Sequence, residues 1–304
     1  MLTSDAHLEK ALEEYNEKVD RLEREDNVRE LLDAYINRGC ILSMMGSNVS
    51  AISDFDDAID IITDLENSGN TVDAGYFVKV YTARGELQTD SAGKDMADDY
   101  RVAASKLGQL VPGSRYFDEK ATINTCLDCA GDLIDNEYPD DAMPFVEKVL
   151  SIVSERTDDV SRNYLLETLN LLGQAHMANE EDQEAYEAFS KAVVLGQGLY
   201  DAGVISDEMD LVLAYVSKGD MDERLEKKDE YFADREAAIE MMEDLRSVGG
   251  LDDEELLSSL HGEIAQAYMA RGEIQKAERH LLKQVSYSLA GSTEDLGENN
   301  YAEE

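Results

Sequence analysis

The chain has 304 residues, of which 68 are acidic and 27 are basic, and its formal net charge is −41. Such a charge repels phosphate groups and anionic lipid headgroups, so it disfavours nucleic acids and membranes as partners. Apolar residues make up 43% of the chain, which is enough for a sizeable core and excludes an acidic disordered protein.

The acidic residues are spread through every segment of the chain. This distribution favours a general solubility role, as in salt-adapted (halophilic) proteins, and a basic partner is the alternative explanation. Three cysteines cannot form a disulfide framework, which predicts a reducing, cytoplasmic location. The first residues lack a basic region followed by an apolar one, so no signal peptide is expected. No apolar run approaches 18 residues, so no membrane span is expected.

The first predicted element is a helix over residues 5–25. Leu8, Leu12, Tyr15, Val19 and Leu22 recur at helical spacing and define one apolar face. This face predicts a capping helix that packs against whatever follows it. A helix lying on a membrane surface is the alternative, and its mostly acidic charges argue against that role.

The rest of the chain repeats itself. The segment AYINRG at residues 34–39 returns as AYVSKG at residues 214–219, which predicts four units of about 45 residues between the two copies. A small residue recurs in the first helix of every unit, at Gly39, Gly85, Ala130, Gly173, Gly219 and Ala265. A triplet at four-then-three spacing follows in the second helix, beginning at Ala51, Met96, Ala142, Ala185, Tyr231 and Ala277.

These patterns have a packing explanation. Two antiparallel helices approach closely only where small residues lie at their crossing, and a large side chain one turn further fills the space toward the next unit. A helix pair alone leaves an apolar face exposed, so the pairs must stack. The residues expected to pack the repeats are Gly39, Ala51, Phe55, Ala58, Gly85, Tyr100, Gly173, Ala185, Phe189, Ala192, Gly219, Ala238, Tyr268 and Ala277.

The pattern resembles the tetratricopeptide repeat (TPR) over residues 28–288, most clearly in the units of Gly39 with Phe55 and of Gly173 with Phe189. The family's usual period is about 34 residues, so the chain is more similar to long-helix variants such as those of kinesin light chain. Arg235 stands where an aromatic residue is expected and Pro144 lies inside a second helix, so the fifth and third units are expected to pack less regularly. The resemblance implies an all-α, right-handed α-α superhelix, a solenoid of about six antiparallel helix pairs.

The unit boundaries follow from capping residues and chain breaks. The expected first-helix starts are Asn27, Thr71, Asp118, Asp158, Ser206 and Asp252. The predicted units are 28–69, 70–113, 114–156, 157–200, 204–249 and 250–290. We expect them to form a single domain over residues 1–290, followed by an acidic, disordered tail at 291–304.

No motif points to catalysis. Cys126 and Cys129 form a C-x-x-C within a helix, without further zinc ligands, and are interpreted as core residues. His176 occupies a large-residue position and is expected to be packed, and the four histidines are far apart in sequence. The acids at 54, 56, 57, 98 and 99 are interpreted as solvated helix faces. We therefore predict no enzyme activity, no cofactor and no metal site.

The resemblance implies that the first helices line a concave groove that binds extended peptides or partner helices. The residues expected in or beside this groove are Asn37, Lys79, Thr82, Glu86, Asn124, Asp128, Asn170, Gln174, Ser217, Asp220 and Gln266. Asn170 and Gln174, four residues apart, could grip a peptide backbone, and two ordinary wet side chains are the alternative. The lysine–asparagine clamp of chaperone-binding members is missing, since Lys79 and Asn124 are isolated. Acidic groove residues favour a neutral or basic partner.

The predicted function is therefore a non-catalytic scaffold or adaptor that binds a peptide or a partner protein in its groove. A peptide- or ligand-responsive regulatory protein that changes its superhelical pitch and signals through a partner is the alternative. An enzyme with a site on the solenoid is a third class, for which the sequence shows no sign. Sequence patterns do not define the oligomeric state.

Overall fold

The structure is a computed structural model that describes residues 4–25, 27–88, 93–251 and 253–294. Within these ranges it is all-α: a first helix is followed by six antiparallel helix pairs, as the sequence predicts. The chain divides into two compact units, Met1–Glu155 and Arg156–Glu304, which are described one by one. The single domain expected from the sequence remains a prediction.

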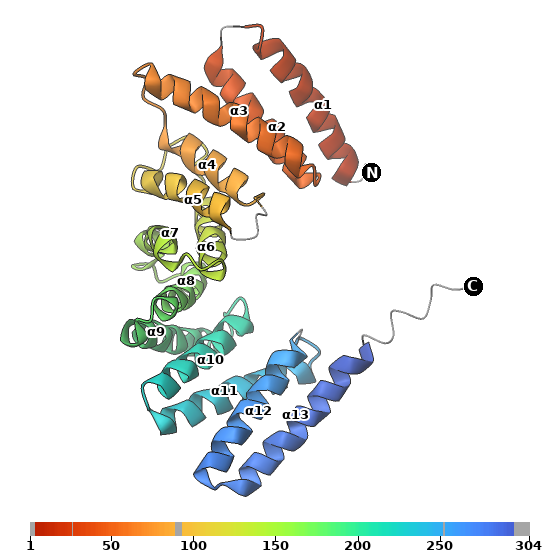
Figure 1. The fold of residues 1–304 in the computed structure, drawn as a ribbon, viewed down its shortest axis with the longest axis vertical. Coiled ribbons are helices and arrows are strands. Elements are labelled where there is room, and N and C mark those ends of the chain that lie inside the picture. Colours follow the sequence, from red (N-terminus) through yellow and green to blue (C-terminus); the bar gives the residue numbers. More distant parts are fainter. Residues whose placement is uncertain (1–3, 26, 89–92, 252, 295–304) are drawn as a thin grey trace, which may run out of the picture. The chain divides into compact units, whose positions relative to one another are not determined.

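The first unit holds the capping helix and three pairs (Figure 1). The capping helix is α1 (Ser4–Leu22), which packs on α2 (Val28–Met44) and buries Val19 and Leu22. The pairs are α2 with α3 (Asn48–Asn67), α4 (Ala74–Gly85) with α5 (Lys94–Leu107), and α6 (Glu119–Asp135) with α7 (Pro139–Val153). Helices α3 and α4 pack together, as do α5 and α7, so each pair contacts the next one.

The second unit holds the other three pairs. These are α8 (Asp159–Ala178) with α9 (Asp182–Asp201), α10 (Glu208–Arg224) with α11 (Lys228–Ser247), and α12 (Glu254–Arg271) with α13 (Ile274–Glu294). Residues 291–294, which were expected to begin the disordered tail, form the end of α13, and residues 295–304 lie outside the described residues. None of the described helices is both long and apolar enough to cross a membrane.

The first helices begin close to the predicted positions. Asn27, Asp118 and Asp158 are N-caps whose side chains accept a hydrogen bond from the backbone N–H three residues on. Asp73 and Asp207 cap α4 and α10, two residues and one residue after the predicted starts. The last predicted start, residue 252, lies outside the described residues, and α12 is capped by the next residue.

The predicted repeat-packing residues are all buried, and the large ring contacts both its own pair and the next one. A Cβ atom built on Gly39 would lie 2.7 Å from Phe55 Cε1, and one on Gly173 would lie 2.5 Å from Phe189 Cε1. Each ring therefore lies directly on the glycine of its own pair, and it also packs toward the next pair as expected: Phe189 shares a buried cluster with Met221 of α10, and the ring of Tyr100 contacts that of Phe145 in α7. The glycine is required because any side chain would occupy the space of the ring.

Buried ion pairs accompany this packing in three of the pairs. A base stands immediately before the glycine, and an acid stands immediately before the ring or its substitute. The pairs are Arg38 with Asp54, Arg84 with Asp99, and Lys218 with Asp234. Asp54 and Asp99 are each only 4% exposed, so their interpretation as solvated acids is wrong. Their carboxylates face the base on the partner helix, where the attraction between the two charges offsets the loss of their hydration.

Arg235, which replaces the aromatic residue, is also buried, at 3% exposure. Its guanidinium lies over Gly219, donates to the carbonyl oxygen of Val216 at 3.0 Å, and forms ion pairs with Asp220 and Glu263. A planar cation with two acidic partners thus fills the place that a ring fills in the other pairs.

Candidate functional site

The first unit has a cavity of about 410 Å³ between α4 and α6. Helix α4 and its C-cap contribute one wall, α6 contributes the opposite wall, and a ring from α5 closes the floor. The lining residues are Lys79, Thr82, Ala83, Glu86, Tyr100, Thr125, Asp128, Cys129 and Asp132. Helix α4 packs mainly on α5 and α6 packs mainly on α7, which leaves space between α4 and α6.

A smaller cavity of about 130 Å³ adjoins the first one. It shares Lys79, Thr82 and Thr125 with its neighbour, so the two cavities follow one another along the same groove. Its remaining walls are mostly apolar and come from α4, α6 and the connection between α5 and α6. They are Gly75, Val78, Leu110, Tyr116, Ala121 and Thr122.

The larger cavity is acidic. Glu86, Asp128 and Asp132 face it with a single lysine, Lys79. Asp128 is exposed, but its carboxyl group is partly removed from water, and this desolvation, together with the nearby Asp132 carboxylate, raises its pKa. Asp132 is held in place by the hydroxyl of Tyr100, which donates a hydrogen bond to it at 2.9 Å. A cation in this space would relieve the repulsion between the carboxylates.

The structure brings four of the predicted groove residues together here: Lys79, Thr82, Glu86 and Asp128 all line the larger cavity. Asn124 is exposed on α6, one turn before Asp128, and lines neither cavity. The remaining predicted residue of the first unit is Asn37. Its side-chain amide donates a hydrogen bond to the carbonyl oxygen of Asp33 within α2.

The predicted groove residues of the second unit have other surroundings. Asn170 is 5% exposed, and its Nδ2 donates to the carbonyl oxygen of Asp210 at 2.9 Å, so it joins α8 to α10 inside the fold instead of facing an open groove. Gln174 and Ser217 are half-buried and Gln266 is exposed. Asp220 is paired with the buried Arg235. None of these side chains lines either of the two cavities between α4 and α6.

Two parts of the site were not predicted from the sequence. Thr125 and Asp132 line the larger cavity from α6, one turn on either side of the predicted Asp128. The helical spacing of 125, 128 and 132 is a signal that could have found both. The smaller cavity had no comparable signal, because Leu110 and Tyr116 come from the connection after α5.

The cysteines are core residues, as expected. Cys126 and Cys129 are buried on α6 without a disulfide. Burial raises the pKa of Cys126 to about 12 and also raises the pKa of Cys129. Both thiols therefore keep their protons at neutral pH, where only the thiolate is an effective nucleophile.

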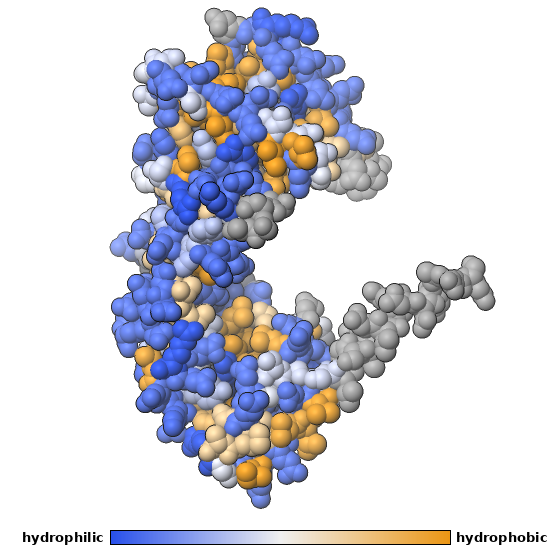
Figure 2. Space-filling model, viewed as in Figure 1, coloured by the Kyte–Doolittle hydropathy of each residue, from blue (hydrophilic) through white to orange (hydrophobic). Residues whose placement is uncertain are grey.

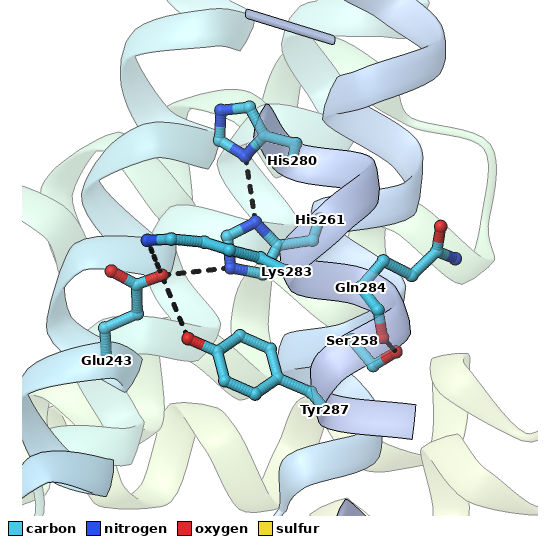
Figure 3. A network of polar contacts seen from close by, with 7 residues as sticks. All are labelled: Glu243, Ser258, His261, His280, Lys283, Gln284 and Tyr287. Atoms are coloured by element: carbon cyan, nitrogen blue, oxygen red, sulfur yellow. Dashed lines mark hydrogen bonds and ion pairs between the residues drawn. The ribbon is translucent and has the colours of Figure 1, made fainter. Parts of the chain in front are cut away.

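A polar network in the second unit joins α11, α12 and α13 (Figure 3). His261 is fully buried, with its Nδ1 2.8 Å from Nδ1 of His280 and its Nε2 3.1 Å from Oε1 of Glu243. Lys283 and Tyr287 donate to the same glutamate. The two histidines are 19 residues apart in sequence, but they lie on facing helices of one pair. Only one proton fits between the two Nδ1 atoms, so the pair cannot carry two charges without separating.

We expect this network to make the second unit sensitive to acid. Burial lowers the pKa of His261 to about 4, from an ordinary value of about 6.5. The unfolded chain therefore takes up the proton first as the pH falls, and the stability that neutral His261 contributes is present above about pH 6.5 and is lost toward pH 4. The loss should amount to roughly 2 to 3 kcal/mol.

The measurement compares the wild type with His261→Gln by hydrogen exchange in residues 254–288 at pH 7.5 and 4.5, corrected for intrinsic exchange rates. Buried Asp222 acts in the opposite sense, because burial raises its pKa to about 6 and acid relieves that cost. For this reason the informative quantity is the difference between the two proteins. His7→Gln, at an exposed position, is the control. Equal pH dependence in the wild type and His261→Gln would contradict the prediction.

Comparisons with known proteins place the fold. No protein-family model and no curated protein matches the sequence. Among solved structures, the chain is similar to RapI in its apo form, with 14% identity, a TM-score of 0.57, and coverage of 92% of this chain and 76% of that one. It is similar to aspartyl phosphate phosphatase F from Bacillus subtilis, with 13% identity, a TM-score of 0.56 and coverage of 96% and 77%. It is also similar to BtubC from P. vanneervenii, with 19% identity, a TM-score of 0.54, and coverage of 72% of this chain and 82% of that one.

The helix pairs and these likenesses define an all-α helical-repeat protein. More narrowly, the fold is TPR-like, as the small-residue and ring pattern predicts. At such low identities the likeness concerns the fold alone, and the function has to be argued from the cavities.

Proposed function

We propose that the chain is a non-catalytic binding protein that holds a peptide segment of a partner protein in the groove between α4 and α6. The observation that carries the proposal is the cavity of about 410 Å³, whose walls combine carboxylates, threonine hydroxyls and the Tyr100 ring. Ligand sites are usually concave and combine convergent polar groups with apolar walls, and here the adjoining smaller cavity supplies the apolar walls. The TPR-like fold is compatible with this role, since its first helices present such a surface.

The charge supports a neutral or basic protein partner. Three carboxylates and one lysine border the larger cavity, and the whole chain carries −41. This field speeds the association of basic segments and opposes nucleic acids and anionic membranes. The three unpaired cysteines support a reducing compartment such as the cytoplasm. The protonated thiols beside the cavity support a binding role over nucleophilic catalysis.

Charge reversal inside the cavity tests the proposal. A phage-displayed library of random heptapeptides is selected against the full chain, and the affinity of the enriched peptides is measured by titration. We expect Asp128→Lys to weaken binding at least tenfold, which corresponds to about 1.4 kcal/mol. The reason is that a lysine at this position repels the basic side chain of the peptide, which the aspartate attracts. Asp128 is exposed and lies at the rim, so the fold should tolerate the change.

The matched control is Asp64→Lys, which makes the same charge change at an exposed position of α3 outside both cavities. The control should bind as the wild type does. A library that yields no binders, or peptides whose affinity falls equally in Asp128→Lys and Asp64→Lys, would contradict binding in this groove.

A further inference from the structure

The two neighbouring cavities differ in size and chemistry, and both belong to one groove. On α4, the lining positions advance from 75, 78, 79 and 82 to 79, 82, 83 and 86. On α6, they advance from 121, 122 and 125 to 125, 128, 129 and 132. The order is the same on both helices, so the smaller cavity lies toward their N-terminal ends and the larger one toward their C-terminal ends.

The separation of the cavities follows from helix geometry. The lining residues shift by about four positions on α4 and about six on α6, and at 1.5 Å per residue the two centres lie roughly 6 to 9 Å apart. An extended peptide advances about 7 Å in two residues, and its side chains at i and i+2 point to the same side. A strand laid along the groove can therefore place two alternate side chains in the two cavities.

The chemistry of each cavity selects a different side chain. The larger one offers Glu86, Asp128 and Asp132 to a long cationic group. The smaller one is walled by Val78 and Leu110 among others, and its volume of about 130 Å³ suits a small aliphatic group. Lys79 borders both cavities, where its ammonium group can donate to a peptide carbonyl oxygen between the two side chains.

We infer that the groove recognises an extended segment in which a lysine or arginine and a small aliphatic residue stand two positions apart. The inference rests on the proposed function and adds the class of peptide to it. Binding energy then comes from two anchors of different kinds, and the two-residue spacing is set by the distance between the cavities.

Synthetic peptides of one composition test the spacing. Acetylated heptapeptide amides contain one valine and one arginine in a serine background, at separations of one, two or three positions and in both orders. We expect the two-position peptides, in at least one order, to bind the wild-type chain at least fivefold more tightly than the others. Asp128→Lys should remove the contribution of the arginine to the affinity while leaving the contribution of the valine.

A second variant addresses the smaller cavity. Ala121 is exposed at its rim, so Ala121→Phe places a ring over it with little change to the core. This variant should remove the contribution of the valine to the affinity while leaving that of the arginine, and circular dichroism checks that the helices are intact.

Equal affinities at all separations, or no binding by any of these peptides, would overturn the inference. If library peptides still depend on Asp128 in that case, peptide binding stands and only the class of peptide is wrong. A library without binders would contradict both.

Discussion

Replacing Gly75 by alanine is expected to lower the free energy of unfolding of the first unit by about 3 kcal/mol or more. A Cβ atom on this residue would lie 1.6 Å from the carbonyl oxygen of Arg115, a backbone atom that cannot rotate away. The contact exists because Oδ1 of Asp73 accepts hydrogen bonds from the backbone N–H of both Gly75 and Arg115, at 2.8 and 3.0 Å. The start of α4 is thereby joined to the connection after α5.

The same substitution at Gly108 is the matched control. This glycine ends α5 with ordinary helical backbone angles, is exposed, and has nothing within 4 Å of an added Cβ atom. Gly108→Ala should leave stability within about 0.5 kcal/mol of the wild type. Urea unfolding followed by circular dichroism measures both variants. Equal stability of Gly75→Ala and Gly108→Ala would show that the approach of the two backbones is not as close as the structure has it.

Breaking the buried pair of Arg38 and Asp54 is expected to cost about 3 kcal/mol. Asp54 accepts from Nε and Nη2 of Arg38, at 2.8 and 2.6 Å, and both side chains are largely removed from water. Asp54→Ala leaves the guanidinium inside the pair with no carboxylate directly opposite. The measurement is again urea unfolding, and the expected change is a lower transition midpoint.

The double variant Arg38→Met/Asp54→Leu separates the net contribution of the ion pair to stability from the penalty of a buried, unpaired charge. Replacing both charges by apolar groups of similar size should recover most of the loss, because neither side chain then needs water or a partner. If the double variant is as unstable as Asp54→Ala, the loss comes from packing volume and the electrostatic explanation is wrong.

The repeat architecture could be predicted from the sequence because it depends on local patterns. The recurrence of small residues at Gly39, Gly85 and Gly173 placed the helix crossings, and capping residues placed the helix starts to within two positions. The rings also lie toward the next pair, as predicted. Spacing alone indicates the face of the helix on which Phe55 lies, but not that its ring also rests on Gly39 of its own pair.

The buried acids could not be predicted from composition. In a chain with 68 acidic residues, Asp54 and Asp99 look like the many solvated ones, and only the pairing of helices shows a base opposite each of them. Hydrophilic side chains do cover most of the face drawn in Figure 2, in keeping with the charge. Asn170 illustrates the reverse difficulty, since a polar residue expected at the surface satisfies a backbone carbonyl inside the fold.

The candidate site was predicted in part. Lys79, Thr82, Glu86 and Asp128 follow from the register of the first helices, because that register fixes which residues face the same side. The presence of a cavity there depends on spacings of a few ångström between neighbouring helices. A repeat pattern does not determine such distances.

Hydrogen exchange of the full chain, with and without an enriched library peptide, tests the central claim most directly. If the peptide lies between α4 and α6, exchange should slow in residues 75–86 and 119–132 and stay unchanged in α8, α10 and α12. The Asp128→Lys variant should lose this protection at the same peptide concentration, and Asp64→Lys should keep it. Protection confined to the second unit, or none at saturating peptide, would contradict the assignment of the groove.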